Sequence, residues 1–414
     1  MYLTAMTHRN ELFDLTLRWM NDDFHPDDGE KITRIFVYES AISAIVMERI
    51  LQFLSEFMGH PLQMERVRLK HELRERIISC LPVRNSRTDE LAGHFLKNPT
   101  YFFPYLPIDA TVITDSAARL VAIGRIKRLT RIAEKVSFRL VEALFKEIQS
   151  KARQLATQRA AAAGVALDTF VSSEATMQHD FIEAEDAVAR SFMDKTIRIA
   201  PADLTINDIL GFKIIAPQTT LDRLPAILGD EPGMTVVEIE RHSGDYNAVN
   251  LLLDISLPSA DVVTARLRDL DWDIARKRGL NPSDIRNNIG RYVGDGAPSI
   301  RLELILTTPE ELMESEFGRS LHELRVLRLR QRQRYSGPLG QNAAYLIEYL
   351  LTLAASPTVS IPEIPIKMYG RYLPEEISTL KSSLHGSVLD DGLLGTFCLQ
   401  QDCPTLFNVP PGGS

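Results

Sequence analysis

One segment of this sequence, residues 303–322, constrains the fold more than any other, because a strand pattern passes directly into a helix pattern. The run of β-forming residues around Glu303 points this side chain away from those of the two neighbouring leucines. Pro309 follows at a position that the first helical turn tolerates, and Glu310 and Glu311 suit the positive end of a helix. We therefore predict a strand that carries Glu303 and a helix that begins at Pro309.

In the region upstream, sequence patterns of β-strands alternate with a pattern of a helix. Runs of strand length, rich in β-branched residues, alternate with turn residues. These runs cover residues 209–216, 234–241, 248–255 and 300–306. Helical periodicity is found over residues 261–278 and stops at Gly279. Together these patterns predict an α+β fold with a mixed β-sheet and helices on one or both of its faces.

An all-α region is predicted before this domain. Within residues 1–115, apolar residues recur at intervals of three and four over residues 11–20, 41–57 and 70–80. Residues 116–165 contain no proline and are predicted to form a long basic helix or connector, which the α+β domain follows over residues 166–355. Residues 356–414 are rich in proline and glycine, which predicts an extended arm with one short helix near residues 375–384.

Two clusters of basic residues are open to two interpretations. The first cluster lies on the connector and comprises Arg125, Lys127, Arg128, Arg131, Lys135 and Arg139. The second follows His322 and comprises Arg325, Arg328, Arg330, Arg332 and Arg334. The first cluster could be a solvated helix face, or a surface that binds phosphate or an acidic part of the same chain. The second could be a solvated or intramolecular face, or it could replace the missing phosphate-binding cations or bind RNA.

Four short segments occur in a fixed order along the chain. They are Ser191-Phe-Met-Asp-Lys195, Asp208-Ile-Leu-Gly-Phe-Lys-Ile-Ile215, Gly244-Asp-Tyr-Asn-Ala-Val-Asn250, and the strand of Glu303 with the helix that bears Glu316, Gly318 and His322 at E-x-G-x-x-x-H spacing. This ordered set resembles the synthetase domain of the RelA/SpoT-type alarmone synthetases. The resemblance covers roughly residues 185–330, which is under half of the chain.

The resemblance implies a nucleotidyltransferase-like domain that moves pyrophosphate from ATP to a hydroxyl of a guanine nucleotide or of RNA. Asp208 and Glu303 would be the catalytic residues and would hold Mg²⁺, which neutralises phosphate charge. Tyr246 would stack on the acceptor purine. The candidates for binding the nucleotides are Lys195, Arg198, Lys213, Tyr246, Glu316 and His322.

The departures from the family pattern leave a second hypothesis open. The basic residues that hold the donor triphosphate in the family are replaced by Glu185 and Ala187, and the Q-x-R after the strand glutamate by Ile305 and Thr307. Asn250 replaces the histidine that closes the tyrosine segment. A catalytically inactive regulatory or scaffold protein that retains the fold is therefore the alternative. If the domain still binds a triphosphate, other cations of the chain must converge on the two carboxylates.

Each candidate residue also has a purely structural interpretation. Asp208 could cap a strand, and Glu303 could be an exposed strand residue. Tyr246 could be a tyrosine at a strand edge, Glu316 an exposed helix residue, and His322 a helix histidine satisfied by a core partner.

Composition excludes several other classes of protein. The 414 residues carry a net charge of −8, which argues against a general nucleic-acid binder, and three cysteines are too few for a disulfide framework. No apolar run reaches the roughly 18 residues of a membrane span, so we expect a cytoplasmic protein without a membrane partner. The single His-Asp dipeptide, His179-Asp180, stands alone, so the metal-dependent hydrolase module of long alarmone enzymes is not expected. The sequence leaves a homo-oligomer open.

Overall fold

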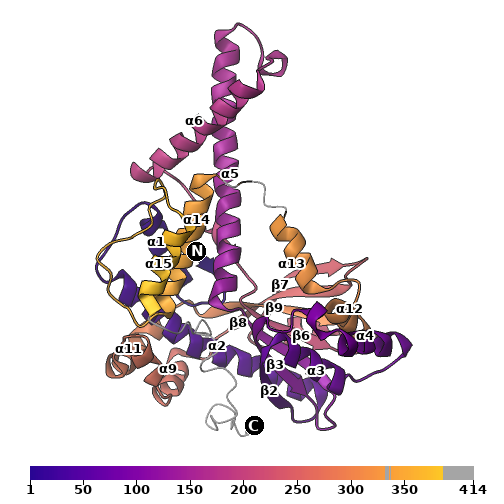
Figure 1. Ribbon diagram of the computed structural model, residues 1–414. Helices are drawn as coiled ribbons and strands as arrows, with labels where there is room; N and C mark the ends of the chain where they lie inside the picture. Colours follow the sequence, from indigo (N-terminus) through magenta and orange to yellow (C-terminus); the bar gives the residue numbers. More distant parts are fainter. Residues whose placement is uncertain (332–334, 336, 386–414) are drawn as a thin grey trace.

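The computed structural model describes residues 1–331, 335 and 337–385 (Figure 1). Arg332 and Arg334, and the part of the expected C-terminal arm beyond residue 385, lie outside the described residues. The short helix expected in this arm is present as α15 (Pro374–His385).

A seven-stranded mixed sheet forms the centre of the structure. Its strands, in spatial order, are β2 (Gln63–Leu69), β3 (Pro107–Thr114), β4 (Leu120–Ile126), β6 (Leu210–Ile215), β9 (Ser299–Thr307), β8 (Ala248–Ser256) and β7 (Met234–His242). Strands β6 and β9 run parallel, and the other neighbours run antiparallel. The predicted α+β class with a mixed sheet is confirmed, and the four predicted strands are present as β6, β7, β8 and β9.

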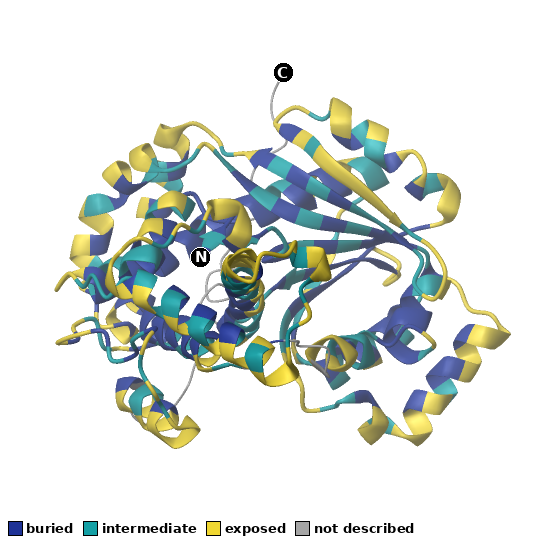
Figure 2. Ribbon diagram, turned by 90° about the horizontal axis from the view of Figure 1, so that it is seen from above, coloured by how far each residue is buried: buried dark blue, intermediate teal, exposed yellow. Residues whose placement is uncertain are grey.

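One face of the sheet packs on the larger hydrophobic core. Side chains that alternate along the central strands, such as Phe212 and Leu304, are buried there. The same core includes residues of α2 (Asp28–Met58), α5 (Leu129–Ala162) and α14 (Pro338–Ala355). Figure 2 shows helices on both sides of the sheet, with buried segments along its strands.

A second, smaller core lies on part of the opposite face. It is formed by α3 (Lys70–Cys80), α4 (Ser86–Lys97) and α12 (Pro309–Phe317), which pack on Ile123 and Ile215 of the sheet. Helix α12 begins as predicted, with Pro309 in its first turn and the side chain of Thr308 accepting a hydrogen bond from the backbone N–H of Glu311 at 3.3 Å. The candidate site lies on this same face of the sheet, beside the second core, since Lys213 is the register partner of Ile123.

The remaining elements surround these layers. They are β1 (Tyr2–Leu3), which pairs with β5 (Thr205–Ile206), and the helices α1 (Arg9–Met20), α6 (Glu174–Met193), α7 (Gln218–Leu221), α8 (Leu224–Asp230), α9 (Ala260–Arg268), α10 (Asp273–Lys277), α11 (Pro282–Asp295) and α13 (His322–Gln331), with short 3₁₀ turns at Pro99–Phe102, Leu167–Thr169 and Pro201–Leu204. Helices α5 and α6 form a hairpin that rises from the body of the structure (Figure 1). None of the described helices is long and apolar enough to cross a membrane.

The prediction that the N-terminal region is all-α is wrong. Strands β2 and β3 lie within residues 1–115, and β4 lies in the segment that was expected to be helical from residue 116. Strand β2 is at the edge of the sheet and mostly solvent-facing, so it lacks a clear apolar alternation. Strand β4 is buried on both faces and therefore reads as a continuous apolar run, which periodicity alone does not separate from a buried helix. The sheet thus draws strands from three of the four regions defined on the sequence.

The single helix predicted over residues 261–278 is also wrong, because two helices, α9 and α10, share this segment. Gly279 follows α10 with a φ of +70°, in the left-handed region that favours glycine. A Cβ atom at this position would lie 2.1 Å from the carbonyl oxygen of Pro357, so the backbones approach too closely for a side chain.

Candidate functional site

The two predicted catalytic carboxylates lie beside each other on the parallel pair of strands. Asp208 stands two residues before β6, and Glu303 lies on β9, where its register partner is Gly211. A Cβ atom on Gly211 would lie 3.9 Å from Oε2 of Glu303, so the glutamate carboxylate extends over this glycine. Burial raises the pKa of Glu303, and the negative charge of Asp208 raises it further. The two carboxylates therefore share one electrostatic environment.

The strand register gathers further polar side chains on the same face. Arg125 of β4 and Glu303 of β9 are both register partners of Gly211, which lies between them. In the next row, Lys213 of β6 and Asn250 of β8 flank Ile305. These polar side chains are half-buried, whereas the residues on either side of Glu303 and of Lys213 are buried in the opposite face. The sheet therefore presents a polar strip in an otherwise apolar surface.

Two lysines outside the predicted set meet Asp208. Nζ of Lys127 lies 2.9 Å from Oδ2 of Asp208 and also donates to the Asp208 carbonyl oxygen. Nζ of Lys135, two turns into α5, contacts the same Oδ2 atom. Burial alone would raise the pKa of Asp208, but the two ammonium groups outweigh it and hold this pKa well below its usual range. Asp208 is therefore ionised and bound by two cations.

Glu316 belongs to a buried network of ion pairs. Its Oε2 atom lies 2.7 Å from Nζ of Lys70, and Lys70 also lies 3.0 Å from Oε1 of Glu323. Arg74 pairs with Glu323 at 2.7 Å, and Arg125 approaches Glu316 at 4.0 Å. Burial opposes ionisation of Glu316, but these cations lower its pKa to about 2. Glu316 is thus neither an exposed helix residue nor a free acceptor.

His322 and Lys213 lie around the same network. Burial lowers the pKa of His322 to about 4, and the charge of Lys70 adds to this effect, so the imidazole is neutral at neutral pH. Burial also lowers the pKa of Lys213 to about 8. Nζ of Lys213 lies 3.5 Å from Oγ of Ser315. Lys213 is therefore a half-buried cation that loses its charge close to the physiological range.

Tyr246 is covered by an arginine. The guanidinium carbon of Arg325 lies 4.1 Å from the centre of the Tyr246 ring, in a cation–π contact. The loop that carries Tyr246 joins β7 to β8, and Asn247 fixes it by accepting a hydrogen bond from the N–H of Gly244 at 2.8 Å. Asn247 also donates to Oε1 of Glu311 on α12 at 3.1 Å. The loop is therefore anchored to the helix that follows the Glu303 strand.

Two of the predicted phosphate-binding residues lie elsewhere. Nζ of Lys195 lies 3.6 Å from Oδ1 of Asp23. Arg198 is exposed in the connection between α6 and β5. Among the described residues, no hydrogen bond or ion pair joins either of them to Asp208 or Glu303.

Sequence reasoning noted the basic stretch but did not assign Arg125, Lys127 and Lys135 to the site. A signal for them was present. Phe192 and Lys195, in the segment that begins at Ser191, are an apolar residue and a lysine three positions apart. Ile132 and Lys135 have the same spacing, and Lys127 precedes them by about one turn. This spacing lies on the connector, outside the region that the resemblance covers.

The residues at the carboxylate pair suit a hard cation such as Mg²⁺. Nδ2 of Asn250 lies 3.4 Å from Oε1 of Glu303, and the Oδ1 atom of Asn250 is buried without a hydrogen-bond partner among the described residues. An unpaired amide oxygen beside the carboxylates of Asp208 and Glu303 gives three oxygen donors, which is the chemistry that Mg²⁺ prefers. Asp208, Glu303 and Asn250 are therefore the candidate metal-binding residues.

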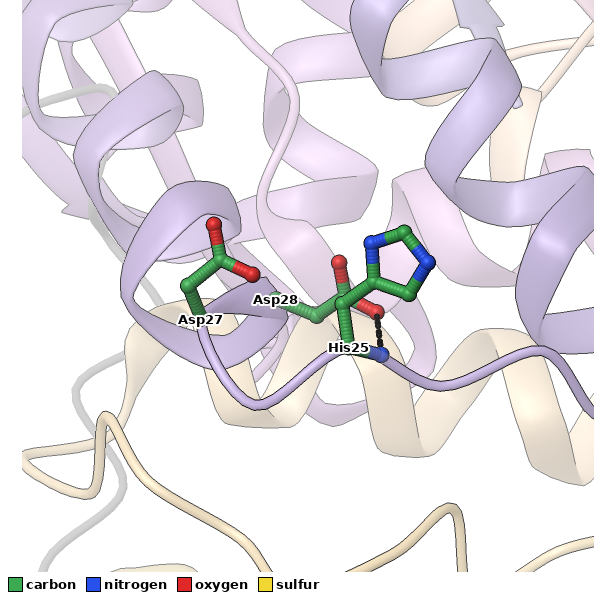
Figure 3. A group of neighbouring side chains, drawn as sticks. All are labelled: His25, Asp27 and Asp28. Carbon is green, nitrogen blue, oxygen red and sulfur yellow. Dashed lines mark hydrogen bonds between the residues drawn. The ribbon is translucent and has the colours of Figure 1, made fainter.

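Two other groups of acidic and histidine side chains occur in the described part of the chain. They are His25, Asp27 and Asp28, and His179, Asp180 and Glu183. In the first group, Asp28 accepts a hydrogen bond from the backbone N–H of His25 at 3.0 Å (Figure 3). Asp28 also pairs with Arg18 and accepts a hydrogen bond from Trp19 at 2.9 Å. In the second, Asp180 pairs with Arg159. Both groups therefore contain a buried aspartate that already has a cationic partner, and neither includes Asp208 or Glu303.

The comparisons with known proteins leave the family of this chain open. No protein-family model matches its sequence, and no curated protein or solved structure is similar enough to it to count as a match.

Proposed function

We propose that this chain binds a purine nucleotide with Mg²⁺ and transfers a pyrophosphoryl group from ATP to a hydroxyl of a nucleotide or of RNA. The observation that carries the proposal is the contact of Lys127 and Lys135 with Asp208, beside Glu303. We call Arg125, Lys127, Lys135, Lys213, Asp208 and Glu303 the central site. Its four cations outnumber its two carboxylates, which is what a site for a polyphosphate beside acidic metal ligands requires.

The roles of these residues follow from their charges. Asp208, Glu303 and Asn250 would hold Mg²⁺, which neutralises phosphate charge and aligns the reacting groups. Lys127 and Lys135 would bind the donor phosphates, since their ammonium groups already lie at the carboxylate that would hold the metal. The acceptor hydroxyl would then attack the β-phosphorus of ATP and release its proton to water. The bond between this phosphorus and the oxygen that bridges it to the α-phosphate would break, and AMP would leave with its electrons.

The sequence pattern supports the same proposal. Asp208, Tyr246, Glu303 and His322 stand in the order in which the resembled synthetases carry their segments. The basic residues that were missing before Ser191 have counterparts in Lys127, which directly follows β4, and in Lys135 of α5. The hypothesis of an inactive protein rests on the loss of phosphate-binding cations from the family motif. Lys127 and Lys135 supply such cations from another part of the chain.

The second candidate is a catalytically inactive scaffold, and the contacts of Tyr246 and Glu316 favour it. Arg325 covers the ring of Tyr246, and Glu316 is neutralised by Lys70 and by the neighbouring arginines. Two residues that would serve the acceptor nucleotide are therefore engaged within the protein itself.

One assay separates the two candidates. The purified chain is incubated with Mg²⁺, ATP labelled in its terminal phosphates, and a panel of GTP, GDP and RNA acceptors. We expect labelled acceptor and AMP from the parent protein, and neither from Asp208→Asn or Glu303→Gln. Asp261→Asn, which changes an exposed carboxylate in the first turn of α9, is the control and should keep the parent activity. Absence of product with every acceptor would favour the scaffold.

A further inference from the structure

Arg325 and Tyr246 form a pair that the proposed reaction leaves unexplained. We propose that Arg325 forms the second wall of a purine-binding site, so that the base inserts between the phenol ring and the guanidinium plane. This inference rests on the proposed function, because it assigns the base of the bound nucleotide to this pair. In the structure, the guanidinium carbon lies 4.1 Å from the ring centre, which is the place that a stacked base would take.

The charge of Arg325 is not neutralised by an acidic partner. Among the described residues it forms no ion pair with a carboxylate, and its buried Nε atom has no hydrogen-bond partner. Its positive charge also contributes to lowering the pKa of Lys213, so the two cations repel each other. An anionic nucleotide would relieve this repulsion, and its base would offer the guanidinium a second aromatic face. Both effects favour the bound state over the empty one.

The pair can open without disruption of a core. Stacked planes lie about 3.5 Å apart, so an inserted base requires the guanidinium to move outward by roughly 3 Å, which a long arginine side chain permits. Arg325 stands in the first turn of α13, whose far end is tied to α5 by the exposed ion pair of Arg330 with Glu134 at 2.5 and 2.8 Å. Exposed ion pairs are weak, so α13 can also shift.

The ligand class follows from the two planes and the cations behind them. Stacking between an aromatic ring and a guanidinium group favours a larger ring area, so a purine gains more than a pyrimidine. Lys213 lies close to Arg325 and belongs to the central site, so the cations of this site can bind the phosphates of the same ligand. The site therefore fits a purine nucleoside polyphosphate. Stacking does not distinguish guanine from adenine.

Calorimetric titration of the full chain with GDP, ADP and UDP in the presence of Mg²⁺ tests the proposal. We expect Arg325→Ala to weaken the binding of GDP and ADP about tenfold, and that of UDP much less, so that the preference for purines falls. Arg325→Lys keeps the charge but lacks the plane, so it should lose most of the same preference. Arg328→Ala, an exposed arginine one turn further along α13, is the matched control and should bind like the parent.

The alternative is that Arg325 only covers the Tyr246 ring, and it predicts the opposite change in the purine affinity of Arg325→Ala. Removal of a cover would tighten purine binding, and that result, or an unchanged affinity in Arg325→Ala, would overturn the inference. If purine binding is lost in Tyr246→Ala but not in Arg325→Ala, the proposed function stands and the inference fails. If the parent chain binds none of the three nucleotides, both fail. Thermal melting of each variant verifies that the fold is retained.

Discussion

The Nζ atom of Lys127 lies 2.9 Å from Oδ2 of Asp208, although 81 residues separate the two in the sequence. The contact exists because β4 pairs with β6, and each of the two residues stands just outside its strand at the same end of this antiparallel pair. The backbone N–H of Lys127 donates to the carbonyl oxygen of Ile209 at 2.9 Å, which continues the pairing beyond the strands. The sheet therefore places a cation at the first residue of the aspartate segment.

This relationship predicts that the two lysines bind phosphate. Lys127→Met and Lys135→Met should each weaken ATP binding by about 1.5–3 kcal/mol, the range for hydrogen bonds to charged groups. Equilibrium titration with a non-hydrolysable ATP analogue measures the effect. Lys146→Met, on the exposed side of α5, is the control, because its ion pair with Glu142 at 3.8 Å is solvent-facing. Equal ATP affinity in all three variants would show that the lysines serve only to neutralise Asp208.

The strands around the carboxylates could be predicted because their sequences have a local signal. The β6 to β9 segments are β-branched and bounded by turn residues, and Pro309 marks the end of the Glu303 strand. The positions of Asp208 and Glu303 at neighbouring strands follow once these strands are assigned. The helix start at Pro309 is equally local, since capping and proline preferences act within one turn.

The cations of the site could not be predicted, because they depend on strand pairing between distant segments. Strand β4 resembles a buried helix in its composition, so its place beside β6 is not visible in the sequence. The same applies to Lys70 and Arg74, which meet Glu316 and Glu323 from a helix about 240 residues away. Lys195 was assigned to the site from its local motif, yet it lies beside Asp23.

The ion-pair network around Glu316 predicts a structural role for this residue. Removing one partner of a buried pair typically costs about 3–5 kcal/mol, so Lys70→Met should destabilise the fold by this amount. Urea unfolding followed by circular dichroism measures it. Arg291→Ala removes an exposed pair with Asp295 and should change the free energy of unfolding by less than about 0.5 kcal/mol. A stable Lys70→Met variant that has lost only nucleotide binding would contradict the structural role.

The lowered pKa of Lys213 predicts a pH dependence of nucleotide binding. The ammonium group is charged below a pKa of about 8 and becomes neutral above it, so the affinity for a nucleotide polyphosphate should fall as the pH rises through about 8. Lys213→Arg keeps its charge throughout this range, so its affinity should stay level between about pH 7 and 9.5. Titration of both proteins across this interval gives the comparison. The neutral His322 does not contribute, because its pKa of about 4 lies far below the interval. A parallel fall in both proteins would assign the titration to another group.

The role of Tyr246 can be separated from a structural role by two measurements on one variant. If a purine stacks on its ring, Tyr246→Ala should weaken nucleotide binding by about 1–3 kcal/mol, the range for base–aromatic stacking. The free energy of unfolding should change little, because the ring is only half-buried and its polar neighbours Arg325 and His242 are themselves outside the hydrophobic core. A core tyrosine would behave in the opposite way, since truncation of a buried aromatic residue typically costs about 3–5 kcal/mol of stability. Tyr292→Ala supplies that comparison, because Tyr292 is buried and donates to Glu39 at 3.0 Å far from the central site. Destabilisation of Tyr246→Ala as large as that of Tyr292→Ala, with unchanged nucleotide binding, would remove Tyr246 from the site.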